Sequence, residues 1–142
     1  MNEKYYLRFP SVLKDAIQKC NLKFPDETLW KYEPQIAFRG IVRKPDDDLT
    51  LKKSDFSSYA ELGRRPRGCR GNNISWYSCS CSKSRKELEA GLKLPRPNRR
   101  IIQGIINDNK GCIYITQNTG HIDWWIYENA NPAEEFEVIR DE

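Results

Sequence analysis

The chain has 142 residues, 38% of them hydrophobic and 31% charged, which is typical of one globular domain with its own core and excludes a largely disordered protein. No apolar run approaches the ~18 residues of a membrane span, and the N-terminal residues lack the apolar core of a secretory signal. The five cysteines are an odd number, and without a secretory signal they predict free thiols in a reducing compartment. We therefore expect a cytoplasmic protein, in the cytoplasm of the producing cell or of a target cell, without membrane association.

The net charge of +4 is unevenly distributed along the chain. Residues 63–100 contain eleven Lys or Arg against two Glu, a balance of +9, whereas residues 101–142 contain two basic residues against eight acids, a balance of −6. This asymmetry predicts one basic and one acidic face, and a basic face attracts the phosphates of nucleotides, nucleic acids or lipids.

The first half of the chain is expected to hold one helix and one strand. Residues 11–20 have apolar side chains near helical spacing, with Ser11 as the expected N-cap. Residues 35–43 form a short apolar run around Arg39 and predict a strand. The next 30 residues are rich in turn-forming residues and predict a loop, with a short helix over 54–62.

The second half is expected to be mostly β-structure. The alternating run 74–82 predicts a strand, and 83–91 a helix that ends at Gly91. Four further β-rich runs are separated by turn residues and cover 99–107, 111–117, 121–127 and 134–139. Together these elements predict an α+β fold in a single domain, 1–142, with an N-terminal helical segment (1–34) and a mixed α/β core (35–142) built on a mostly antiparallel sheet.

The stretch from Ser78 to Ser82 alternates serine and cysteine, which has several interpretations. Zinc commonly takes four ligands from Cys-x2-4-Cys pairs, and no second closely spaced pair accompanies Cys79 and Cys81. The Cys-x-x-Cys form of a redox pair is also missing. On a strand the three serines face one side and the two cysteines the other. We therefore expect no metal site here, but buried cysteines and serines that face a cleft.

The single histidine, His121, begins a strand that contains Trp124 and Trp125. An ordinary packed strand residue is one interpretation, and the base of a Ser-His-Asp hydrolase is another. No Gly-x-Ser-x-Gly elbow, Walker loop or Gly-x-Gly-x-x-Gly motif is present, which disfavours a hydrolase, an NTPase and a Rossmann binder. Adjacent strand residues face opposite sides, so at most one of the two tryptophans is expected in the core.

Three short motifs follow one another along the chain. Arg39 follows Phe38 on the first strand, a Ser78-Cys79-Ser80 strand follows, and a Glu135-x-Glu137 strand precedes two aliphatic residues. In this order the sequence resembles the arginine–serine–glutamate class of ADP-ribosyltransferases, between residues 36 and 139. The resemblance departs from the family pattern where cysteine replaces the threonine of a Ser-Thr-Ser strand.

The resemblance implies a small NAD-dependent, toxin- or effector-type ADP-ribosyltransferase that consumes NAD as its substrate. Arg39 would bind a phosphate of NAD, while Ser78 and Ser80 would hold a ribose or orient the glutamate. Tyr77, or Trp76 beside it, would stack on nicotinamide or adenine.

The resemblance also implies catalytic carboxylates. Glu137 would stabilise the positive charge that develops on the ribose, and Glu135 would orient or deprotonate the acceptor. Glu128 and Glu134 are alternatives for the catalytic carboxylate. A related NAD-degrading arrangement would pair Arg39 with Glu61 instead.

A protein without catalysis is the main alternative. Its basic face (63–100), with Arg64, Arg65, Arg67 and Arg70, and its acidic C-terminal half would bind nucleic acid or a partner protein. An inhibitor or immunity protein belongs to this class. The expected partners are thus a protein or nucleic-acid acceptor, and a cognate inhibitor or antitoxin if the protein is a toxin.

Overall fold

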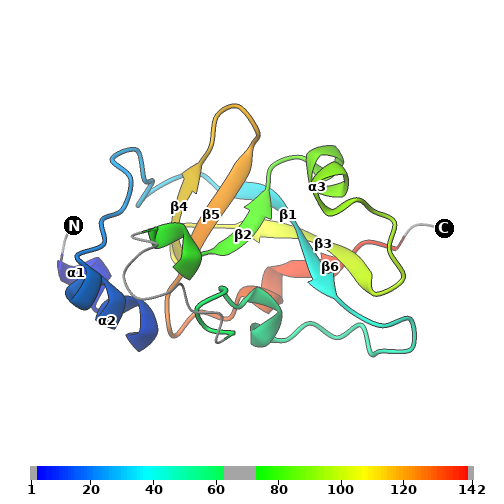
Figure 1. Ribbon diagram of the computed structural model, residues 1–142, viewed down its shortest axis with the longest axis horizontal. Coiled ribbons are helices and arrows are strands. Elements are labelled where there is room, and N and C mark those ends of the chain that lie inside the picture. The colour runs from blue at the N-terminus through cyan, green and yellow to red at the C-terminus, as the bar shows by residue number, and fades with distance from the viewer. Residues whose placement is uncertain (1–2, 63–72, 141–142) are drawn as a thin grey trace.

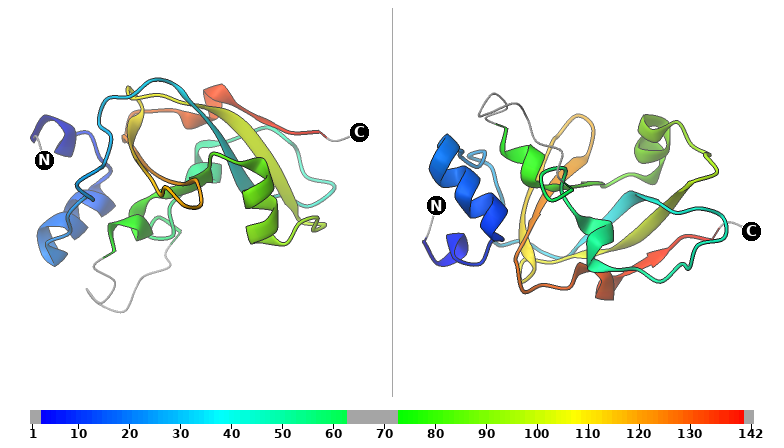
Figure 2. Two further views of the ribbon diagram at one scale, coloured as in Figure 1. Left: turned by 90° about the horizontal axis from the view of Figure 1, so that it is seen from above. Right: turned by 60° about the horizontal axis from the view of Figure 1, so that its bottom comes forward.

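The fold is taken from a computed structural model, which describes residues 3–62 and 73–140. A six-stranded sheet forms its centre, in the order β4-β5-β2-β1-β3-β6, and all neighbouring strands are antiparallel (Figures 1 and 2). The predicted α+β class is confirmed. In chain order the elements are α1 (Glu3–Tyr6), α2 (Ser11–Cys20), β1 (Gln35–Val42), the 3-10 helices η1 (Lys53–Phe56) and η3 (Ile74–Tyr77), β2 (Cys79–Ser82), α3 (Arg85–Leu92), β3 (Arg99–Ile106), β4 (Gly111–Ile115), β5 (His121–Ile126), the 3-10 helix η4 (Pro132–Glu135) and β6 (Phe136–Val138). No helix within the described ranges is long and apolar enough to cross a membrane.

The two central strands of the sheet, β1 and β2, are paired at only one position. β1 pairs with β3 along its whole length, from Gln35 opposite Ile106 to Val42 opposite Arg99. On its other side β1 pairs with β2 only where Phe38 lies opposite Ser82. Beyond this point β1 and β2 diverge, and the space between them becomes part of the site described below.

Both faces of the sheet carry apolar clusters, because α2 and the preceding residues cover one face and the η1 and η4 segments cover the other. Trp124 and Trp125 are therefore both buried, with exposed fractions of 0% and 1%. The expectation that only one tryptophan is core is wrong, since alternation places them in different clusters. Trp124 belongs to the buried cluster that also contains Ala37, Ile41, Phe56, Cys79, Cys81, Ile102, Ile106, Ile113, Ile122 and Phe136. Trp125 belongs to the buried cluster that also contains Phe9, Leu13, Ala16, Leu22, Ile74, Cys112 and Tyr127.

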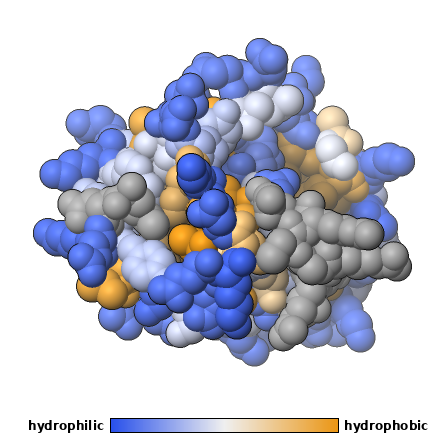
Figure 3. Space-filling model, turned by 60° about the vertical axis from the view of Figure 1, so that its left-hand side comes forward, coloured by the Kyte–Doolittle hydropathy of each residue, from blue (hydrophilic) through white to orange (hydrophobic). Residues whose placement is uncertain are grey.

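The helix predicted over residues 11–20 is confirmed, with Leu13 and Ala16 buried against the sheet. Ser11 is its first residue and not its cap, because Pro10 occupies the cap position, where proline's fixed φ of −59° leads into the helix. The helix ends before Asn21, which adopts a left-handed conformation. The surface at this end of the molecule is largely hydrophilic, with separate apolar areas (Figure 3).

Three predicted element boundaries are corrected, each for a local reason. Residues 74–77 form η3 instead of a strand, because the Asn73 side chain accepts a hydrogen bond from the Ser75 amide and caps the turn. α3 continues through Gly91 to Leu92 and ends at left-handed Lys93, shortly before a proline. Glu135 belongs to η4, which Pro132 and the Asn131 cap initiate, and only Glu137 of the expected Glu-x-Glu pair lies on a strand.

Candidate functional site

A polar cluster lies on the paired strands β2 and β5. Ser80 lies opposite Asp123 and Ser82 opposite His121, so their side chains share one face of the sheet. The Ser80 hydroxyl oxygen lies 2.7 Å from His121 Nε2, and His121 Nδ1 lies 3.8 Å from Asp123 Oδ2. The imidazole, whose side chain is 42% exposed, thus lies between a hydroxyl and a carboxylate.

Asp123 is the buried end of this cluster, and Ser78 holds it. The Ser78 Oγ lies 2.7 Å from Asp123 Oδ1 and also 2.7 Å from the Ser75 carbonyl oxygen. The Ser78 hydroxyl has one proton, which it donates either to Asp123 Oδ1 or to the Ser75 carbonyl. Burial raises the pKa of Asp123, opposed by the Ser78 hydrogen bond and the nearby imidazole. Burial outweighs these two opposing effects, so Asp123 keeps its proton to a higher pH than a free aspartic acid does.

A cavity of about 320 Å³ adjoins the cluster where β1 and β2 diverge. Ser78 and Ser80 line one side, α3 lines another with Leu88 and Leu92, and the η1 segment closes a third. Gly40 lies beneath α3, where a larger side chain would collide with Leu92. The other lining residues are Arg39, Ile41, Val42, Ser54, Asp55, Ser57, Tyr59, Leu62 and Arg99. Polar and apolar walls together suit a ligand with both kinds of group.

Arg39 links the diverging elements around this cavity. Its Nη1 donates to the Ser80 carbonyl at 2.7 Å, its Nε to the Asp55 carbonyl at 2.9 Å, and its Nη2 to the Ser57 carbonyl at 3.3 Å. The bond from Arg39 Nη1 to the Ser80 carbonyl joins β1 to β2 where the two strands are not paired with each other. The guanidinium therefore holds β2 and the η1 segment against β1.

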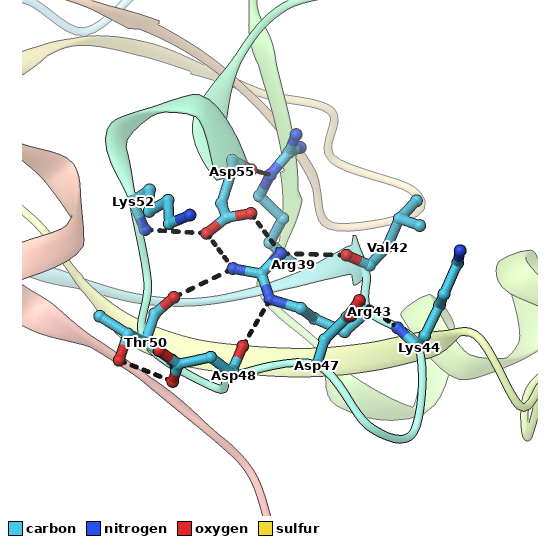
Figure 4. A network of polar contacts seen from close by, with 9 residues as sticks. All are labelled: Arg39, Val42, Arg43, Lys44, Asp47, Asp48, Thr50, Lys52 and Asp55. Atoms are coloured by element: carbon cyan, nitrogen blue, oxygen red, sulfur yellow. Dashed lines mark hydrogen bonds and ion pairs between the residues drawn. The ribbon is translucent and has the colours of Figure 1, made fainter.

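A second arginine holds the η1 segment from below (Figure 4). Arg43 donates from both terminal nitrogens to the two Asp55 carboxylate oxygens, at 2.7 and 2.6 Å. Burial of Asp55 acts to raise its pKa, but the hydrogen bonds from Arg43 and the Lys52 amide outweigh it, so the pKa of Asp55 is lowered. Arg43 also bonds the carbonyls of Val42, Asp48 and Thr50. Asp55 thus connects Arg43, through its carboxylate, with Arg39, through its carbonyl.

The predicted cofactor-binding residues are partly brought together. Arg39, Ser78 and Ser80 line the same cavity, whereas Tyr77 lines a separate, smaller one beside Cys79 and Trp124. The aromatic residue at the main cavity is Tyr59, whose ring lies 5.0 Å from that of Trp76. Sequence reasoning missed Tyr59 because nothing in the local pattern of a loop shows which side chain faces a distant strand.

The predicted carboxylates lie elsewhere. Glu137 on β6 lies opposite Gln103 and, with Glu134 and Glu135, lines a groove of about 450 Å³. β1 and β3 separate β6 from β2, which at ~4.8 Å per strand corresponds to roughly 14 Å. Of the other candidates, Glu61 accepts a hydrogen bond from the Ser58 amide at 3.0 Å and lines the small cavity. Glu128 follows β5, and its backbone carbonyl accepts a hydrogen bond from Lys53.

The cysteines of the serine–cysteine stretch point into the core as predicted. Cys79 and Cys81 are buried and unpaired, with sulfurs 3.9 Å apart. Cys112 is also buried and free, but Cys20 is disulfide-bonded, which corrects the expectation of free thiols at that position. Within residues 3–62 and 73–140, no group of three or more His, Cys, Asp or Glu side chains is arranged to hold a metal ion.

The basic face is described only in part. Arg64, Arg65, Arg67 and Arg70, expected to contact nucleic acid, lie outside the described residues. From 73 to 100 the chain has seven Lys or Arg against two Glu, a balance of +5. This segment includes α3 and the start of β3, which form one side of the cavity.

Comparison with protein-family models, curated protein sequences and solved structures finds no match to this chain.

Proposed function

We propose that the protein cleaves NAD and transfers ADP-ribose to a macromolecular acceptor, with Asp123 as the catalytic carboxylate in place of Glu137. The observation that carries this proposal is the 2.7 Å contact between Ser78 and Asp123, beside a cavity that Arg39, Ser78 and Ser80 also line. The resemblance implies a serine that orients an acidic residue, and Ser78 with Asp123 meets this requirement on directly paired strands.

The roles follow from charge development during cleavage. As the bond between nicotinamide and ribose breaks, positive charge develops on the sugar, and the ionised Asp123 carboxylate stabilises it. Ser78 fixes the position of that carboxylate. His121 precedes Asp123 by two residues on the same face, as Glu135 was expected to precede Glu137. Its Nε2, bonded to Ser80, accepts the proton of the incoming nucleophile.

The proposal is tested by incubating the purified protein with NAD and measuring nicotinamide release, with cell lysate as a source of acceptors. We expect release above a buffer control and a 10²- to 10³-fold loss in Asp123→Asn, a typical effect of removing one electrostatic stabiliser. Glu137→Gln is the matched control, because it removes one carboxylate from the same sheet, and it should retain activity. No release by the wild type, or loss in Glu137→Gln with retention in Asp123→Asn, would contradict the proposal.

A second candidate function is acyl transfer with Ser80 as nucleophile. The 2.7 Å contact between Ser80 and His121 favours it, since an imidazole in this position activates a hydroxyl. A fluorophosphonate probe distinguishes the two functions. Labelling of Ser80 that His121→Gln abolishes, in a protein that releases no nicotinamide, would replace NAD cleavage with acyl transfer.

A further inference from the structure

Arg99 is a second arginine at the cavity. It begins β3 opposite Val42 and lines the cavity together with Ser78 and Ser80. Paired residues share a face of the sheet and successive residues alternate. Arg99 therefore lies on the face that carries Ser80, whereas Arg100, opposite Ile41, lies on the other.

The two cavity arginines differ in what they bind. The Arg39 guanidinium already donates hydrogen bonds to three carbonyl groups, which belong to β2 and the η1 segment. The Arg99 side chain has no hydrogen bond or ion pair with any residue in the described part of the chain. The carboxylate of Asp55, the other charged residue of the lining, is occupied by Arg43. Arg99 thus has its guanidinium donors available for a ligand.

We propose that Arg99, and not Arg39, binds the phosphate groups of the ligand in this cavity. The inference rests on the proposed function only in taking NAD as that ligand. A guanidinium offers a planar fork of donors that matches phosphate oxygens, and the balance of +5 over residues 73–100 adds a favourable field around it. Arg39 is then a structural residue that keeps the cavity open by joining its walls.

Binding measurements by calorimetry test this assignment, with Asp123→Asn as the parent protein so that NAD is not consumed. Adding Arg99→Ala should weaken NAD binding roughly 10- to 100-fold, which corresponds to the loss of charge-assisted hydrogen bonds, and Arg99→Lys should restore part of it. Arg100→Ala, the neighbouring arginine on the opposite face, should bind NAD as the parent does. Adenosine, which has no phosphate, should bind with the same affinity whether or not Arg99 is present.

Unchanged NAD affinity in Arg99→Ala, or an equal loss in Arg100→Ala, would overturn the inference. If neither the parent nor the wild type binds NAD, the proposed function fails, and inorganic pyrophosphate becomes the probe. Pyrophosphate binding that Arg99→Ala abolishes would then still support a phosphate site at Arg99, and absence of binding would refute it. Thermal unfolding of each variant separates these outcomes from misfolding, which we expect for Arg39→Ala but not for Arg99→Ala.

Discussion

Replacing Asp55 with asparagine tests the link between the η1 segment and the sheet. The two side chains of the pair are only 12% and 10% exposed, for Arg43 and Asp55 respectively. Both carboxylate oxygens accept from Arg43, and Oδ2 also accepts from the Lys52 amide at 2.8 Å. Asparagine removes the charge and places an amide donor against these donors, while Arg43 remains partly buried.

The expected cost follows from this geometry. Removing one partner of a fully buried ion pair costs about 3–5 kcal/mol, and Arg43 keeps three carbonyl acceptors after the change, which reduces the penalty. We expect Asp55→Asn to lower the free energy of unfolding by about 3 kcal/mol, or the melting temperature by roughly 10 °C for a domain of this size. Asp48→Asn is the matched control, since it removes the same charge from the same loop but only the bonds to Thr50.

The pH dependence gives a second readout. The folded-state pKa of Asp55 is lowered, so its stabilisation is present above the unfolded pKa, near 4, and is lost as pH falls through the lower folded value. The free energy of unfolding of the wild type, measured in urea, should therefore fall as the pH is lowered below about 4. In Asp55→Asn it should depend less on pH in this range. A loss below ~1 kcal/mol in Asp55→Asn, or an equal loss in Asp48→Asn, would show that the pair does not hold the segment.

Three further predictions concern buried groups on β2, β4 and β5. Burial raises the pKa of Asp123, so the stability that its proton contributes is present below about pH 4 and is lost as pH rises through the raised value. Asp123→Asn should therefore unfold at the same or higher urea concentration than the wild type at pH 8, and a less stable variant would contradict this. Cys79, Cys81 and Cys112 should react with a thiol reagent only over hours in the native state but at once in guanidinium chloride. Fast labelling of Cys81 in the native protein would contradict this, because it would show that β2 is accessible to the reagent. Cys81→Asp should unfold the protein.

The strands and the long helix could be predicted from the sequence because their signals are local. The apolar spacing of α2 and the β-branched runs of β1 and β3 are visible within ten residues. Where short-range caps compete with a pattern, prediction failed, as at η3, where alternation continued but the Asn73 cap formed a turn. The divergence of β1 from β2 has no local signal, since it depends on the η1 segment and on Arg39.

The candidate site could be predicted only as far as the chain order of an arginine and a serine. His121-x-Asp123 and Glu135-x-Glu137 have the same spacing, and period-two alternation predicts a shared face for either pair. The two residue pairs differ in which strand lies beside the strand that carries them. β5 pairs with the serine strand, whereas β6 lies at the sheet edge beyond β3. Strand order depends on long-range contacts, so no local pattern could rank the two pairs.

The surroundings of the two carboxylates are the reason for proposing Asp123, and not Glu137, as the catalytic residue. A carboxyl group with an exposed fraction of 8% is costly to bury, and a hydrophobic residue of similar size would fill the same position on β5 more favourably. Glu137 carries no such cost because it is exposed. Acids with a perturbed pKa concentrate where a protein uses the proton or the charge. Asp123 has a raised pKa, the orienting Ser78 and a nearby imidazole, and Ser78 and Ser80 also line the cavity; the proposed role in NAD cleavage uses the ionised form of this carboxyl group.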